Sequence, residues 1–309
     1  MMSRWRMMIF LALFLATTLT PGTAGAATER SADGQTRVLV TTFPLWLMAR
    51  RVAADVPGVA VDLMIPAGSG CPHDYGLTPR DMMLLSGADV LIMNGLGLEA
   101  SLGPDAGTVA ARLKPGGRVI AAAEGVPDIL PDEDGTRANP HLFASPRMAA
   151  LLVKNIGAGL AEADPAHADR YLNNAESYAV TLDALADAFA ALGARLANPR
   201  VVTQHRDFDY LARDAGLNIA GVVRPHEGQE PSAADLLRLT RLIREENVGA
   251  VFTEPQYPAK AGETLARETG VPLAVLDPVA NGPADASPDY YERVMENNLR
   301  TLERTLDAR

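Results

Sequence analysis

The feature that most constrains the fold of this chain is a regular alternation of short β-branched runs with segments suited to helices. Strands that alternate with helices pair in parallel, because each helix carries the chain back to the starting edge of the sheet. The sequence therefore predicts parallel sheets covered by helices. We expect strands at residues 37–42, 59–65, 89–93, 118–122, 200–204, 217–222, 248–253 and 273–276.

A stretch without internal proline separates the first four predicted strands from the last four. Between Pro165 and about Ala197, apolar side chains recur at steps of three and four residues, which is the spacing of one face of an amphipathic helix. We predict an α/β fold with two Rossmann-like lobes, each with a four-stranded parallel sheet, joined by this one long helix. A single doubly wound sheet is the alternative, but it would need an oversized crossover.

The chain also indicates where its parts begin. The predicted parts are residues 27–164 for the N-terminal lobe, 165–197 for the linking helix and 198–309 for the C-terminal lobe. Thr78 precedes Pro79, with Asp81 three residues past the threonine, and Ser145 precedes Pro146. A hydroxyl residue followed by proline predicts a helix N-cap and the first helical residue.

The first 26 residues have the order of a secretory signal peptide. Arg4 and Arg6 precede an apolar run from Ile9 to Thr20, and the small residues Ala24-Gly25-Ala26 follow. This order matches the charged, apolar and cleavage regions of such a leader. An uncleaved membrane anchor is the alternative, but the run is short for a bilayer span. We predict an exported protein from which residues 1–26 are removed.

Charge and cysteine content limit which partners the protein can bind and what can stabilise its fold. The formal net charge is −10, and removal of the leader with its two arginines would make it more negative. An acidic protein argues against nucleic acid or an anionic membrane as a partner and suits a cation. The one cysteine, Cys71, cannot form an internal disulfide, so the apolar core must stabilise the protein. A lone cysteine is more often a packed side chain than a metal ligand.

Polar side chains with metal-binding chemistry follow four of the predicted strands. His73 follows the second strand, His141 the fourth, His205 the fifth and Asp277 the eighth. The carboxyl ends of parallel strands lie at one edge of a sheet, where ligands usually bind. Because two of these residues come from each lobe, we expect the four side chains to meet in a cleft between the lobes.

Three imidazoles and a carboxylate form a complete ligand set for a first-row divalent metal. Three nitrogen donors favour zinc, and manganese is the alternative because it prefers more oxygen. A single histidine after a strand is more often a hydrogen-bonded loop residue, so the prediction depends on the four together. We expect His167 to be solvated and His226 to lie in a surface loop or serve as an accessory ligand. Glu254 also ends a strand and is a candidate supporting or alternative oxygen ligand.

Several longer stretches resemble one protein family. They are VTTFPLWLMARRVA, IPAGSGCPHDYGLTPRDMMLLSGADVLIMNGLGLEASL, NPHLFASP, TQHRDFDYLARDAGL, EPSAADLLRL and VFTEPQYPAKAGETLARETGVPLAVLDPVANG. Over essentially the whole mature chain, the sequence resembles the zinc- and manganese-binding subunits of bacterial ABC metal importers. Those subunits are soluble receptors that capture metal outside the inner membrane and deliver it to a permease.

This resemblance implies two α/β lobes bridged by a long helix, with small local changes on metal capture. It assigns the four metal positions of the family to His73, His141, His205 and Asp277, and a histidine at the third position is typical of zinc members. We therefore expect a periplasmic solute-binding protein for zinc, monomeric and without enzymatic activity, with an inner-membrane ABC permease as its partner.

Three features depart from the family pattern. Cys71-Pro72 stands where many members have Asp-Pro before the first ligand histidine. Residues 124–139 are acidic and lack the histidine-rich loop of many zinc members. No lipid-attachment cysteine follows the leader, which implies a protein that is not tethered to the membrane.

Two other functions fit parts of the pattern. A zinc-dependent hydrolase would use three protein ligands and a metal-bound water, but the sequence contains neither an HExxH pair nor a GxSxG elbow. A receptor for a metal chelate or another small ligand would need a wide apolar pocket at the cleft.

Overall fold

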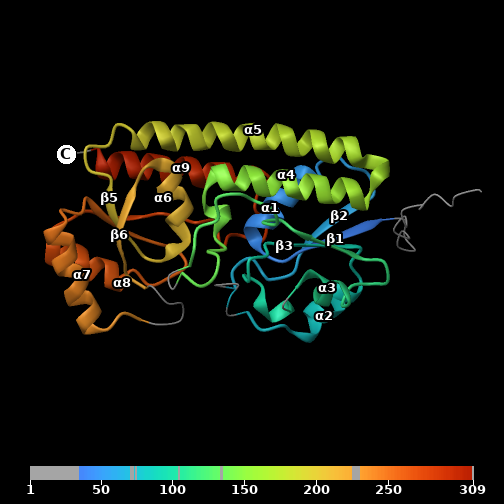
Figure 1. Ribbon diagram of the computed structural model, residues 1–309, viewed down its shortest axis with the longest axis horizontal. Helices are drawn as coiled ribbons and strands as arrows, with labels where there is room; N and C mark the ends of the chain where they lie inside the picture. Colours follow the sequence, from blue (N-terminus) through green and yellow to red (C-terminus); the bar gives the residue numbers. More distant parts are fainter. Residues whose placement is uncertain are drawn as a thin grey trace, which may run out of the picture.

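The computed structural model describes residues 35–69, 73, 75–103, 105–132, 135–224 and 230–307. Within these ranges the chain forms two four-stranded parallel sheets that lie side by side under a layer of long helices (Figure 1). The strands are β1 (Thr36–Val40), β2 (Val59–Leu63), β3 (Val90–Met93), β4 (Arg118–Ala121), β5 (Arg200–Thr203), β6 (Asn218–Val222), β7 (Ala250–Thr253) and β8 (Leu273–Val275). Each one falls within the predicted range or starts one residue before it, and the two separate sheets confirm the two-lobe prediction over a single sheet.

The second sheet repeats the winding of the first. The strand orders are β2-β1-β3-β4 and β6-β5-β7-β8. In each lobe the first strand therefore pairs with the second strand on one side and with the third strand on the other. In the first sheet Val38 pairs with Val61 on one side and Val90 on the other. Because all strands of a sheet run in the same direction, their carboxyl ends share one edge.

Helices cover both sheets. They are α1 (Phe43–Val52), α2 (Pro79–Ser86), α3 (Ala106–Ala110), α4 (Pro146–Ala163), α5 (Ala168–Gly193), α6 (Asp209–Ala215), α7 (Ala233–Glu245), α8 (Lys260–Thr269) and α9 (Tyr290–Leu306), with short 3-10 turns η2 (Ala100–Leu102), η3 (Leu142–Ala144), η4 (Pro165–His167) and η5 (Arg206–Phe208). Helix α5 extends along both lobes, and α4 and α9 pack beneath it (Figure 1). Among the described residues, none of the helices is both long and apolar enough to cross a membrane.

Both predicted helix starts are present. The Thr78 hydroxyl accepts a hydrogen bond from the Asp81 amide at 3.3 Å, and the Asp81 carboxylate accepts one from the Thr78 amide at 2.8 Å. This reciprocal pair satisfies two amides that have no partner inside α2. Ser145 caps α4 by accepting from the Met148 amide at 3.5 Å.

The long helix differs in detail from the prediction. Its first residues form the 3-10 turn η4, and the regular helix ends at Gly193, short of the predicted Ala197. The apolar face is buried as expected, with Tyr178, Leu182 and Phe189 in the core. The packing of α4 against one half of α5 was not predicted from the sequence (Figure 1).

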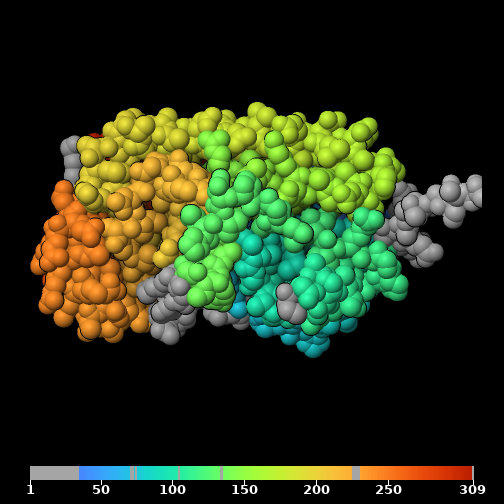
Figure 2. Space-filling model, in the orientation of Figure 1, coloured from blue at the N-terminus to red at the C-terminus, as the bar shows by residue number. Residues whose placement is uncertain are grey.

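One segment of the N-terminal half lies across the junction between the lobes. It follows β4, is bridged on itself between Pro131 and Ala138, and leads to His141. Figure 2 shows this green segment between the orange C-terminal lobe and the blue-green N-terminal lobe. The predicted leader, Cys71 and His226 lie outside the described residues.

Candidate metal centre

The four candidate ligands occupy the ends of strands or the turns beyond them. His73 follows β2, His141 precedes η3, His205 lies between β5 and η5, and Asp277 follows β8. His205 is 4% exposed, and the other three side chains are half-buried. Both lobes therefore contribute imidazole groups with limited contact with water.

The structure brings the three histidines close to one another. The rings of His73 and His141 have centroids 5.4 Å apart and meet edge to face at 64°. Burial, followed by the nearby charges of His73 and His205, lowers the pKa of His141 to about 3. Asp207, two residues after His205 in the C-terminal lobe, has Oδ1 3.5 Å from Nε2 of His141, so the His205 turn lies beside the rings of the N-terminal lobe.

Asn139 fixes the ring of His141. The amide oxygen Oδ1 of Asn139 lies 2.9 Å from Nδ1 of His141 and accepts a hydrogen bond from the His141 backbone amide at 3.0 Å. Because this oxygen can only accept, Nδ1 carries the proton and Nε2 carries the lone pair. A metal ligand needs that lone pair, and the ring orientation is set before any metal arrives.

Glu254 has the same role for His205. Its Oε2 lies 3.2 Å from Nδ1 of His205, and its Oε1 accepts from the His205 backbone amide at 3.2 Å. The Gln256 side chain donates to the same carboxylate at 2.7 Å. Of the two predicted roles for Glu254, the geometry favours the supporting one, because the carboxylate faces Nδ1 and places the lone pair on Nε2.

Asp277 is held by contacts on its own side of the site. Its carboxylate accepts from the Val279 amide at 2.8 Å, and its backbone amide and carbonyl both bond to the Asn298 side chain of α9. Burial raises the pKa of the Asp277 carboxyl, and the Val279 hydrogen bond partly offsets this. Within the described residues, no hydrogen bond or ion pair joins Asp277 to a histidine.

The four candidates do not form an assembled site. In the part of the chain that the structure covers, no group of three or more histidine, cysteine, aspartate or glutamate side chains stands in a metal-holding arrangement. The structure thus brings histidines of both lobes into one region. Closing four ligands on one ion would require local side-chain movement.

Sequence reasoning missed two residues that border the site. Oδ1 of Asp207 lies 3.5 Å from Nε2 of His141, across the junction between the lobes. The Tyr257 ring lies against His205, with centroids 4.3 Å apart. Asp207 follows His205 by two residues, and this acidic neighbour was the one available sequence signal.

His167, expected to be solvated, instead pairs with Asp164 at 2.7 Å and is mostly buried.

The lowered pKa of His141 predicts acid sensitivity of the metal-free protein. The unfolded chain binds a proton at this histidine below pH 6.5, whereas the native state does so only near pH 3, so lower pH favours unfolding. Between pH 7 and pH 5 this one group should reduce the free energy of unfolding by about 2 kcal/mol. Urea denaturation with a chelator present, at both pH values, measures it. In His141→Gln the free energy of unfolding should fall less between pH 7 and pH 5 than in the wild type, by the same amount of about 2 kcal/mol. An equal fall in the two proteins would contradict the prediction.

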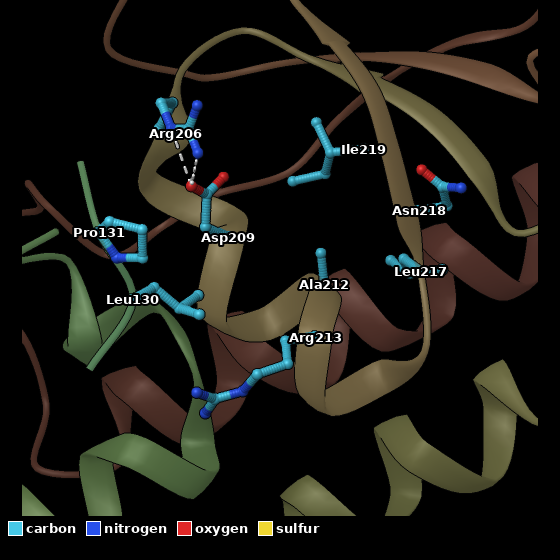
Figure 3. A pocket seen from close by; sticks show the side chains of 9 residues that line it. All are labelled: Leu130, Pro131, Arg206, Asp209, Ala212, Arg213, Leu217, Asn218 and Ile219. Atoms are coloured by element: carbon cyan, nitrogen blue, oxygen red, sulfur yellow. Dashed lines mark hydrogen bonds and ion pairs between the residues drawn. The ribbon is translucent and has the colours of Figure 1, made fainter. Parts of the chain in front are cut away.

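One cavity among the described residues borders the turn that follows His205. It has a volume of about 500 Å³ and is lined by residues of the segment after β4 and of η5, α6 and β6 (Figure 3). Its lining residues are Leu130, Pro131, Arg206, Asp209, Ala212, Arg213, Leu217, Asn218 and Ile219. None of the four candidate ligands is among them.

Comparison with solved structures supports the two-lobe fold. FpvC from Pseudomonas aeruginosa, solved in complex with Mn²⁺, is 34% identical with a TM-score of 0.77, and the match covers 89% of this chain and 99% of that chain. The same protein solved with Ni²⁺ gives 34% identity and a TM-score of 0.76, over 89% and 97% of the two chains.

Comparison with known sequences gives the family. The high-affinity zinc uptake system protein ZnuA of Bacillus subtilis is 28% identical over 326 residues, 99% of each protein. The zinc-binding lipoprotein AdcA of Streptococcus pneumoniae is 27% identical over 96% of this chain, which spans only 61% of that relative. A family model described as "Zinc-uptake complex component A periplasmic" matches residues 38–305. This match over most of the sequence shows that the chain belongs to the family of periplasmic A components of zinc-uptake complexes.

Proposed function

We propose that this protein captures a divalent metal, zinc ahead of manganese, between its two lobes and delivers it to the permease of an ABC importer. The observation that carries the proposal is the gathering of His73, His141 and His205 from both lobes in one region. The proposed ligands are these three imidazoles and the Asp277 carboxylate.

The chemistry of these groups suits capture. His141 is neutral throughout the physiological pH range, so a metal displaces no proton from it. Asn139 and Glu254 contact the Nδ1 atoms of His141 and His205, so the Nε2 atom of each ring points away from its supporting side chain. The Val279 amide holds Oδ1 of Asp277, so Oδ2 is the oxygen that we propose as the ligand.

Zinc is favoured because three of the four proposed donors are nitrogen. The Bacillus subtilis relative is named as a zinc-uptake protein and the Streptococcus pneumoniae relative as a zinc-binding one, whereas the FpvC structures hold Mn²⁺ and Ni²⁺. The test is metal analysis of protein purified without added metal, followed by calorimetric competition between zinc and manganese. Tighter binding of manganese would overturn the zinc assignment, and binding of neither metal would overturn the function.

The rival functions have less support. Membership in a family of zinc-uptake components argues against the hydrolase function. A chelate receptor would need a wide apolar pocket lined by the ligands, and the metal titration distinguishes it by whether the free ion binds. We further propose export by a cleaved leader, a periplasmic location, a monomeric state, and the lobe boundaries predicted above.

Glu254→Gln tests the supporting role of the buried carboxylate. Glutamine is uncharged and accepts a weaker hydrogen bond from the His205 ring, so the ring becomes a poorer zinc ligand. Losses of such partners typically lower metal affinity by about 10- to 100-fold, and we expect a decrease in this range by calorimetric titration. Glu263→Gln, which makes the same change on the exposed surface of α8, should leave the affinity unchanged. Equal affinities for the two variants would remove Glu254 from the site.

A further inference from the structure

Asn139 makes contacts in both lobes at once. Its side chain is buried, with 2% of the residue exposed. On the N-terminal side, its amide oxygen holds both the Nδ1 atom and the backbone amide of His141. On the C-terminal side, its amide nitrogen donates to the backbone carbonyl of Arg206 at 3.1 Å and to Oδ2 of Asp209 at 3.3 Å.

The orientation of this amide is determined by its neighbours. The oxygen faces the His141 backbone amide and the nitrogen faces two acceptors, so a flipped amide would place like groups against each other at these three contacts. The Asn139 backbone carbonyl also accepts from the Tyr210 hydroxyl at 2.7 Å. The residue is therefore attached to α6 through both its side chain and its backbone.

The C-terminal side of this attachment is itself well anchored. Oδ2 of Asp209 accepts a hydrogen bond from Nε of Arg206 at 2.9 Å and forms an ion pair with Nη2 of the same side chain at 2.8 Å, as drawn in Figure 3. Tyr210 is fully buried, and its hydroxyl accepts from the Leu130 amide at 3.1 Å. Since Arg206 directly follows His205, Asn139 links the ring of one proposed ligand to the backbone beside another.

We propose that Asn139 is a positioning residue that couples the orientation of the His141 ring to the alignment of the two lobes. A shift of the C-terminal lobe relative to the N-terminal lobe pulls on the Asn139 amide, and the hydrogen bond to Nδ1 of His141 transmits that shift to the ring. The lobes and the metal-binding nitrogen therefore move together. The role of His141 as a ligand rests on the function proposed above, but the coupling itself is a property of the metal-free protein.

Asn139→Asp separates the two halves of this role. A carboxylate still accepts from Nδ1 and the backbone amide of His141, but it cannot donate to the Arg206 carbonyl or to Asp209. If Asn139 acted on His141 alone, this variant would bind zinc at least as tightly as the wild type. Coupling predicts instead a loss of about tenfold, at the lower end of the range for groups that support a ligand.

Two further variants complete the affinity test. Combining Asn139→Asp with Asp209→Asn restores a donor and an acceptor across the junction with reversed direction, and we expect it to recover most of the lost affinity. The matched control is Asn155→Asp, which removes an amide that donates to the Ala122 and Glu124 carbonyls within one lobe, and it should leave the affinity unchanged. Wild-type affinity in Asn139→Asp, or no recovery in the double variant, would overturn the coupling.

A measurement without metal keeps this test distinct from that of the proposed function. In Tyr210→Phe, a substitution on α6 that removes the hydroxyl bonded to the Asn139 carbonyl, the Nδ1 proton of His141 should exchange with water several-fold faster in NMR spectra, because the attachment of Asn139 is weakened. An unchanged exchange rate would overturn the coupling even if zinc binds. Failure of the wild type to bind zinc, with accelerated exchange in Tyr210→Phe, would overturn the proposed function alone.

Discussion

His205→Ala is expected to lower zinc affinity at least about 100-fold. Four-ligand zinc sites in small domains bind with about 10–16 kcal/mol, so one ligand corresponds to about 3 kcal/mol. His205 is the most buried of the proposed ligands, and little water can replace the lost ring. The Glu254 carboxylate would also lose its partner on Nδ1. Calorimetric titration of purified, metal-depleted protein measures the change.

His167→Ala is the matched control for this experiment. His167 is also mostly buried and also pairs with a carboxylate, that of Asp164, but it lies in the turn before α5. Its removal should leave zinc affinity within about twofold of the wild type. Similar affinities for the His205 and His167 variants would place the metal elsewhere on the protein.

Gly193→Ala is expected to destabilise the protein by about 3 kcal/mol or more. A Cβ atom on Gly193 would lie 1.5 Å from the Ala215 carbonyl oxygen and 2.7 Å from its carbonyl carbon. Alanine in a helix is ordinarily favoured over glycine by about 1 kcal/mol, but both groups in this contact belong to the backbone and cannot rotate away. The steric cost therefore exceeds the helix preference, and α5 must separate from the end of α6.

Urea denaturation of the metal-free protein measures this effect. Gly68→Ala is the control, because no atom lies within 4 Å of a Cβ at that position, and we expect its free energy of unfolding to change by less than about 0.5 kcal/mol. A wild-type midpoint for Gly193→Ala would mean that α5 and α6 approach less closely than described.

The strands were predictable because their signal is local. Val38, Ile92 and Val251 lie in short β-branched runs that have no alternative to burial in a parallel sheet. The capped helix starts at Thr78 and Ser145 were predictable for the same reason, since cap and first turn are adjacent in sequence.

The supporting contacts at the site could not be predicted in this way. Glu254 reaches the His205 ring across 49 residues, and Asn139 reaches Arg206 across 67. Such pairs depend on how β5, β7 and α6 are placed in three dimensions, which no local pattern records. The strand-end rule pointed to one edge for all four ligands, and the rings of His73 and His141 lie side by side, but the convergence of the four on one ion stays a prediction.

The shared helical layer has a thermodynamic consequence for the whole molecule. One continuous apolar core contains Val38 of the first sheet, Phe189 of α5 and Phe252 of the second sheet. Melting either half alone would expose the face of α5 that the other half helps to bury, and that apolar area has a large free-energy cost in water. Neither half is therefore expected to persist as an independent folding unit, and loss of structure in one should entail loss of structure in the other.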